Sequence, residues 1–433
     1  MKTRMNFKDE FYQKLKLLVL PIAIQNFMLA LVSATDAIML GWIDQTSLSA
    51  VSLAGQVQFV LSLFISGIAA GAGIMAAPSW GKQDAASIEK VIPIALRTNL
   101  LFSGLFTILA GFCPEMLMRI FTNDAALVAS GSQYLRAVAL SYVLCGISQV
   151  YLILLKNTGH AAVSSRISST AVVLNIILNA ILIYGLCGAP ALGIRGAAYA
   201  TVAARVVELI WAYLETKKPE RVRILWNRLF SSAGKILSED FWRYTLPVLA
   251  ASLVWGIAYV LYSVIMGHMG SDAVAANSIT SIAKSLLSCL IRGVSGGAGV
   301  LIGNLLGANE LEKAREYGGR LSHLSIAIGI VTGGLLMLIS PAIVHFAPLS
   351  DTAAEYLQYM LLFCGLNLMA QSVNTTVLDG IFCAGGDAKF DMQGNIGAMW
   401  CFSVPLGFLA AFWLKLPVMV VYCIVNLDEI VKL

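Results

Sequence analysis

Long, mainly apolar stretches dominate the chain and are separated by short polar segments. Two of them read AVVLNIILNAILIYGL from Ala171 and LSIAIGIVTGGLLMLISPAIV from Leu324. A run of about 18 or more apolar residues is typical of a helix that crosses a lipid bilayer, where all backbone hydrogen bonds must be made internally. The pattern therefore predicts an all-α polytopic membrane protein with twelve transmembrane helices. The predicted spans cover residues 14–40, 51–77, 92–113, 134–156, 166–186, 194–215, 241–267, 274–302, 320–346, 353–382, 390–414 and 416–431.

The composition agrees with a membrane protein. Hydrophobic residues make up 58% of the chain and charged residues 12%, whereas a soluble domain carries about 25% charged residues. The cysteines are scattered singly without a CxxC pair, so we expect them to fill apolar space and to bind no metal. The segment MKTRMNFKDEFYQKLKLL lacks a small-residue cleavage site, so we predict no signal peptide.

The distribution of Lys and Arg over alternate loops predicts the orientation of the chain. With the N-terminus inside, 22 of the 29 Lys and Arg residues lie inside, 4 lie outside and 3 lie within spans. Cytoplasmic loops carry the excess of Lys and Arg in membrane proteins. Both termini are therefore predicted to be cytoplasmic, in the cell (inner) membrane. The basic residues lie between apolar runs, so we predict no nucleic-acid surface.

The two halves of the chain are related by a shift of 226 positions. Pro21 falls on Pro247, and GIAAGAG from Gly67 falls on GVSGGAG from Gly293. Glycine and proline carry much of this match, and they are the residues that permit kinks and close helix contacts. A parallel repeat of this kind is typical of transporters that work by alternating access. We predict a six-helix N-terminal lobe over 1–216, a cytoplasmic linker over 217–240 and a six-helix C-terminal lobe over 241–433.

Several segments, in this order and spacing, resemble the multidrug and toxic compound extrusion (MATE) family. In the first half they are LPIAIQN, TDAIMLG, GAGIMAAPSWGKQD, LNIILNAILIYG and GIRGAAYATVAAR; in the second half they are GGAGVLIGNLLGANE and LDGIFCAGGDAKF. The resemblance covers nearly the whole chain. It implies a two-lobe antiporter that exports organic cations or amphipathic drugs in exchange for Na⁺ or H⁺, with no cofactor beyond that coupling ion.

Asp36 is the main candidate for cation coupling. It lies late in the first span, in LVSATDAIMLG, where a carboxylate costs roughly 2.5–3.5 kcal/mol unless it is paired or lines a wet cavity. A carboxylate can bind Na⁺ or accept a proton, and either event removes a charge that can bias a two-state protein. The position of Asp36 matches the first-helix acid of the family. The alternative is a side chain that reaches headgroup water.

Three further residues are predicted to belong to the coupling site. Asn175 and Asn179 lie on one helix face because they are four residues apart. The family pattern often has an acid at the second position, whereas an amide offers a carbonyl oxygen to a cation but cannot take a proton. Thr201, in GAAYATVAAR, matches a family position near this pair and adds a hydroxyl. Helix–helix hydrogen bonding is the alternative role of these residues.

The second half departs more from the family pattern. A serine replaces the Glu that relatives carry after the seventh-helix Leu-Pro, and its repeat partner is Asn26. Lys284 lies near the middle of the eighth span and falls on Gln58 in the repeat. We assign Lys284, Gln58 and Asn26 to the substrate cavity, where a lysine can pair with a carboxylate or an anionic substrate group. Structural roles are expected for Asp379 and Asp387 at a turn near the membrane face.

A flippase for lipid-linked oligosaccharides, of related fold, is the alternative function. Such proteins hold a pyrophosphate with several basic residues, and here only Lys284 and Arg292 qualify, which argues against a flippase. A receptor or scaffold is disfavoured by the duplicated halves. The sequence contains no recognisable nucleophile–base pair, phosphate-binding loop or metal motif, so we expect no enzymatic activity. The expected partners are a small-molecule substrate and membrane lipid, and the protein is expected to be a monomer.

Overall fold

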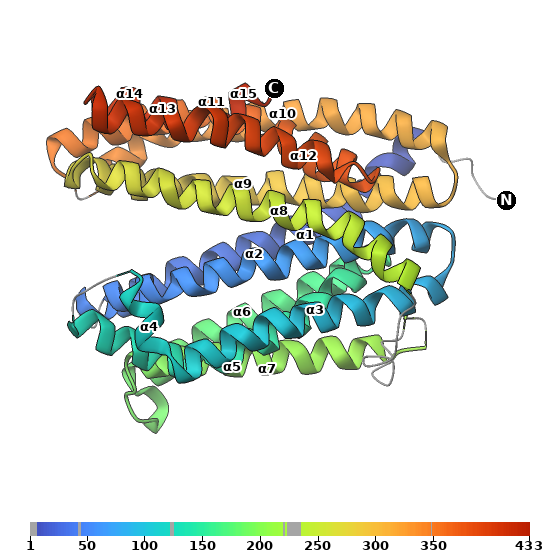
Figure 1. The fold of residues 1–433 in the computed structure, drawn as a ribbon, viewed down its shortest axis with the longest axis horizontal. Coiled ribbons are helices and arrows are strands. Elements are labelled where there is room, and N and C mark those ends of the chain that lie inside the picture. The colour runs from blue at the N-terminus through green and yellow to red at the C-terminus, as the bar shows by residue number, and fades with distance from the viewer. Residues whose placement is uncertain (1–6, 42–44, 122–124, 220, 223–234, 348) are drawn as a thin grey trace. The chain divides into compact units, whose positions relative to one another are not determined.

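The computed structural model describes residues 7–41, 45–121, 125–219, 221–222, 235–347 and 349–433 and contains no β-strand among them (Figure 1). Within this part of the chain, 11 helices are long and apolar enough to cross a membrane, so the all-α polytopic prediction is confirmed. The first ten of them contain α1 (Phe7–Gly41), α2 (Gln45–Gly81), α3 (Ala85–Phe112), α5 (Ala125–Asn157), α6 (Ala161–Tyr184), α7 (Ile194–Thr216), α8 (Lys235–Gly267), α9 (Ser271–Gly307), α10 (Leu311–Phe346) and α11 (Asp351–Asn374).

Two of the spans contain π-helical segments. The tenth span continues from α11 into the π-helix η3 (Thr375–Phe382). Such turns often mark functional sites in helices. Short elements connect the long helices elsewhere, namely α4 (Pro114–Arg119) and the 3₁₀-helix η1 (Leu186–Gly188). The eleventh span consists of α12 (Ala388–Asn395), the π-helix η4 (Ile396–Ser403), α13 (Val404–Phe408) and the π-helix η5 (Leu409–Trp413).

The prediction of one continuous helix over 416–431 is wrong. This segment forms two short helices, α14 (Val418–Val425) and α15 (Asp428–Val431). At the break, the backbone oxygen of Asn426 accepts a hydrogen bond from Asn367 Nδ2 of α11 at 2.6 Å. In a continuous helix this oxygen would bond the amide of Ile430, but that amide donates to the oxygen of Leu427 instead.

The helix boundaries agree with the predicted repeat. Helices α1 and α8 end at Gly41 and Gly267, and α2 and α9 extend over Gln45–Gly81 and Ser271–Gly307, each 226 positions apart. The agreement extends to the backbone after α2 and α9, where Gln83 and Asn309 both have a φ of 61°. The two halves therefore repeat their first helices residue by residue, including the turn that follows the second helix.

The chain forms two compact units whose boundaries fall inside helices. One unit contains residues up to Asn26 and Ala250–Leu433, and the other contains Phe27–Leu249. Helices α1 and α8 therefore each begin in one unit and end in the other. This assignment differs from the predicted lobes 1–216 and 241–433 at the helix starts, and the functional lobes stay a prediction. Residues 220 and 223–234 of the predicted linker lie outside the described residues.

Glycines in α2 and α9 permit close packing against the first parts of α8 and α1, respectively. A methyl group on Gly71 of α2 would lie 2.8 Å from the Cα of Thr245 in α8. At the equivalent position of the repeat, a methyl group on Gly297 of α9 would lie 2.8 Å from Val19 Cγ2 in α1. Because ordinary carbon contacts lie near 3.5–4.0 Å, a larger residue at either position would force the two helices apart.

Replacement of Gly71 by alanine should therefore destabilise the protein. Overpacking of a tight contact costs about 1–3 kcal/mol. Gly55 is the matched control in the same helix, because a methyl group there would meet no atom within 4 Å. Gly55→Ala should be neutral or stabilise the helix by up to about 1 kcal/mol. Thermal unfolding of the detergent-solubilised variants measures both, and equal midpoints for Gly71→Ala and Gly55→Ala would contradict the close contact.

Candidate functional site

The predicted coupling residues of the first half come together in the unit formed by Phe27–Leu249. Asp36 lies in the last part of α1 and accepts a hydrogen bond from Asn179 Nδ2 of α6 at 2.5 Å. The same amide nitrogen also donates to Asn175 Oδ1, one turn earlier in α6, at 3.2 Å. The carboxylate is therefore held by a side chain that carries no charge.

A second link extends this network to α7. Asn175 Nδ2 donates to Thr201 Oγ1 at 3.3 Å, and Thr201 Oγ1 donates to the backbone oxygen of Ala197 at 3.0 Å. The four predicted residues therefore form one hydrogen-bonded chain that connects α1, α6 and α7. Polar side chains that bond in this way polarise one another, so a change in one hydrogen bond of the chain alters the strength of the others.

The turn between α6 and α7 explains why these side chains face one another. Helix α6 ends at Gly185, whose φ of 74° is left-handed and suits glycine. In α7, a methyl group on Gly196 would lie 2.6 Å from the backbone carbon of Leu182, so the two helices pack nearly backbone to backbone. The end of α6 is also tied to α1, because Tyr184 Oη donates to the backbone oxygen of Met39 at 2.7 Å.

The surroundings of the network are apolar. Asn179 is fully buried and Asn175 is 4% exposed, while Asp36 and Thr201 are half-buried. Asn179 Oδ1 is buried, and no donor among the described residues reaches it. A buried acceptor without a partner costs about 1–3 kcal/mol. The site thus combines a carboxylate with a free carbonyl oxygen. Oxygen atoms of both kinds can bind a hard cation or accept a hydrogen bond.

The residues predicted to line a substrate cavity are divided between the two compact units. Lys284 of α9 donates to Asn367 Oδ1 of α11 at 3.0 Å, within the unit that contains Ala250–Leu433. Asn26 and Gln58 are half-buried and belong to different units. Their place in a substrate cavity stays a prediction.

A buried ionic network in the second half was missed by the sequence analysis. Lys432 lies 3.4 Å from Asp428 Oδ2 and 3.5 Å from Glu429 Oε1, and all three side chains are at most 10% exposed. Asn374 of α11 donates to Glu429 Oε2 at 3.0 Å. The signal was present in the sequence, because NLDEIVKL places three charges beside an apolar run.

The acids near the tenth span have separate roles. Asp387 caps α12 by accepting from the backbone amide of Phe390 at 3.3 Å, which agrees with its predicted structural role. Asp391, which the sequence analysis did not consider, is buried and accepts from Asn395 Nδ2 at 2.9 Å. Asp379 lies in the π-helix η3 and interacts with Asp391. Among the described residues, no three His, Cys, Asp or Glu side chains are arranged to hold a metal ion.

Comparison with known proteins gives one consistent result. The sequence model of the MatE family matches residues 21–181 and 247–409 of this chain, which is more than half of it. A similar curated protein is the probable multidrug resistance protein YoeA of Bacillus subtilis, 20% identical over 97% of this chain and 91% of its own length. Another is the probable multidrug resistance protein NorM of Thermotoga maritima, 23% identical over 94% of this chain and 87% of its own length.

Solved structures share the fold. One is an outward-facing multidrug resistance MATE family transporter of the MOP superfamily, with a TM-score of 0.87, 20% identity, and coverage of 97% of this chain and 92% of that one. Another is a mutant of the Vibrio cholerae MATE transporter VcmN, with a TM-score of 0.88, 14% identity, and coverage of 98% and 94%. Identities this low support the fold alone.

A double-mutant cycle tests the hydrogen bond between Asp36 and Asn179. We expect Asp36→Leu and Asn179→Leu to be non-additive in unfolding free energy by about 0.5–3 kcal/mol, because each change alone removes the hydrogen bond that the two side chains share. Asp36→Leu combined with Thr332→Val should be additive, since Thr332 lies in α10 of the other unit and bonds its own helix backbone. Additivity of the first pair in chemical unfolding would contradict the bond.

Proposed function

Because this chain belongs to the MatE family of multidrug efflux transporters, we propose that it is a secondary active antiporter. It exports organic cations or other amphipathic compounds in exchange for Na⁺ or H⁺, by alternating access. It works as a monomer in the cell membrane with both termini cytoplasmic, an orientation supported by the excess of Lys and Arg in the predicted inside loops. The observation that carries the proposal is the pairing of buried Asn179 with Asp36.

The chemistry of the site suits a coupling ion. For Na⁺, the Asp36 carboxylate and the unpaired Asn179 Oδ1 offer oxygen ligands from α1 and α6. For H⁺, a protonated Asp36 gains a donor, and rotation of the Asn179 amide by half a turn would present Oδ1 to it. In either case the negative charge of Asp36 is cancelled and the hydrogen-bonded chain to Thr201 is rearranged.

The position of Asp36 connects this local event to a larger change. Helix α1 begins in one compact unit, up to Asn26, and carries Asp36 in the other. A ligand shifts a two-state equilibrium only by its difference in affinity for the two states. A coupling ion that binds the network more tightly in one arrangement of α1 therefore favours that arrangement. An organic cation competes with the coupling ion for the same negative charge. Binding of one therefore favours release of the other.

Transport in proteoliposomes tests the proposal. Ethidium efflux should be driven by an imposed pH gradient or an imposed Na⁺ gradient, and the gradient that works identifies the ion. In Asp36→Asn, gradient-driven efflux should fall at least about tenfold, which corresponds to a rise of about 1.4 kcal/mol in the activation free energy of transport. Size-exclusion chromatography and thermal unfolding of the same samples show whether the variant is folded.

Asp351→Asn is the matched control. It removes the same charge from an exposed position at the first residue of α11, so its efflux should equal that of the wild type. Wild-type coupling in folded Asp36→Asn would refute the role of Asp36. Absence of transport under both gradients from folded wild-type protein would favour the flippase alternative, which uptake of a lipid-linked oligosaccharide then tests.

A further inference from the structure

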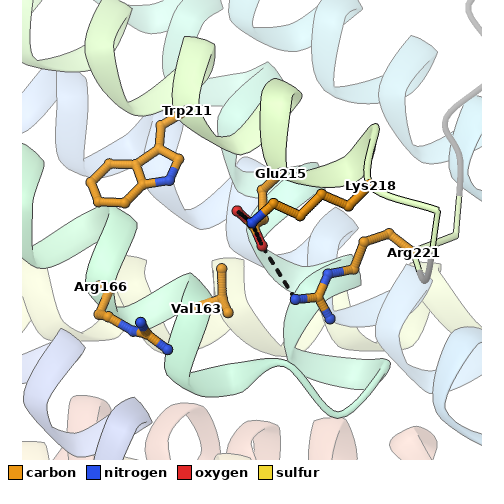
Figure 2. A pocket seen from close by; sticks show the side chains of 6 residues that line it. All are labelled: Val163, Arg166, Trp211, Glu215, Lys218 and Arg221. Carbon is orange, nitrogen blue, oxygen red and sulfur yellow. Dashed lines mark hydrogen bonds and ion pairs between the residues drawn. The ribbon is translucent and has the colours of Figure 1, made fainter.

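A polar cavity lies at the end of α7, away from the coupling network. Its volume is about 320 Å³, which exceeds many times the roughly 10–15 Å³ that one water molecule needs. Four of its lining residues come from α6 and α7, and two come from the segment that follows α7 (Figure 2). The lining residues are Val163, Arg166, Trp211, Glu215, Lys218 and Arg221.

The cavity carries an excess of positive charge. Its lining has three basic side chains and one acid. The acid is already engaged, because Glu215 accepts from Lys218 Nζ at 2.8 and 2.9 Å and from Arg221 Nη2 at 3.2 Å. Arg166 is exposed and bonds the backbone oxygen of Ala162 through its Nε at 3.4 Å. The lining therefore offers the terminal nitrogens of Arg166 no further acid to pair with.

The side chain of Arg221 has the features expected of a residue that binds an anion. Its side chain is 12% exposed, and its Nε and Nη1 are buried without a hydrogen-bond partner among the described residues. A guanidinium has five N–H donors in a planar fork that matches the oxygens of a phosphate. Burial lowers the pKa of Arg221, as expected where loss of water disfavours the charged form. A bound phosphate would supply the missing acceptors and the missing negative charge.

We propose that this cavity binds the phosphate group of an anionic phospholipid. The site lies where the apolar part of α7 ends at Thr216, so a lipid headgroup is at the right depth. Trp211 is 37% exposed, and exposed tryptophans are enriched at the membrane–water interface. Basic pockets between transmembrane helices on the cytoplasmic side are suited to lipid headgroups, and this end of α7 is on the predicted cytoplasmic side. The proposal does not depend on antiport.

Native mass spectrometry of the delipidated full-length protein tests the site. The probes are dioleoyl phosphatidylglycerol, which is anionic, dioleoyl phosphatidylcholine, which has the same chains but no net charge, and inorganic phosphate as a competitor. The wild type should bind phosphatidylglycerol in preference to phosphatidylcholine. Arg221→Gln should weaken that binding about tenfold, the effect of one lost charge-assisted hydrogen bond. Arg166→Gln should weaken it in the same direction and should fold normally because its side chain is exposed.

Lys217→Gln is the matched control. Lys217 adjoins the cavity in sequence but lies over the ring of Tyr213, 4.4 Å from its centre, and does not line the cavity. Its removal should leave phosphatidylglycerol binding unchanged. Equal weakening by Lys217→Gln and Arg166→Gln would overturn the proposal in favour of diffuse surface charge. Equal binding of both lipids would overturn it as well, and displacement of the lipid by millimolar phosphate would assign the cavity to a soluble anion instead.

Discussion

Close packing at glycines is the constraint on which the rest of this structure depends. Gly67 and Gly71 of α2 lie against the first part of α8, and Gly293 and Gly297 of α9 lie against the first part of α1. These contacts leave no room for a side chain, so they fix which helix can occupy each place. As a result each compact unit contains the start of one helix whose end belongs to the other. The starts of α1 and α8 are thus exchanged between the units, and the same exchange occurs in both copies of the repeat.

This exchange of helix starts matters for the proposed coupling site because α1 carries Asp36. Asp36 lies on the part of α1 that belongs to the unit of Phe27–Leu249, while the start of the same helix packs in the other unit. Helix α1 extends from Phe7 to Gly41 without a break, although Pro21 within it has no backbone N–H to donate. Neutralisation of Asp36 therefore acts on an element that both units share. The amide of Asn179 holds the carboxylate without cancelling its charge, so the charge remains available to an incoming cation.

The sequence predicted most of the fold because hydrophobic length and glycine spacing are local properties. Asp36, Asn175 and Asn179 were also recognisable as candidate site residues, because Asp36 interrupts an apolar run and the two asparagines are one turn apart, whereas Thr201 was added from the family resemblance. Hydrogen-bond partners distant in sequence could not be predicted in this way. At the break before α15, the hydrogen-bond partner of Asn426 is Asn367, 59 residues away, and no pattern within the last segment reveals it. The boundaries of the compact units depend in the same way on contacts between the halves of the repeat.

Asp36 and the two acids near the end of the chain, Asp428 and Glu429, differ in the partner that holds each carboxylate. In the second half, Asp428 and Glu429 have Lys432 as a counterion within 3.5 Å. The two carboxylates share this one lysine, so their charge is partly compensated within the protein. Asp36 bonds Asn179, and the described residues supply it with no basic partner. The charge of Asp36 can therefore be satisfied by a bound cation, which supports the proposed role of Asp36 in ion coupling.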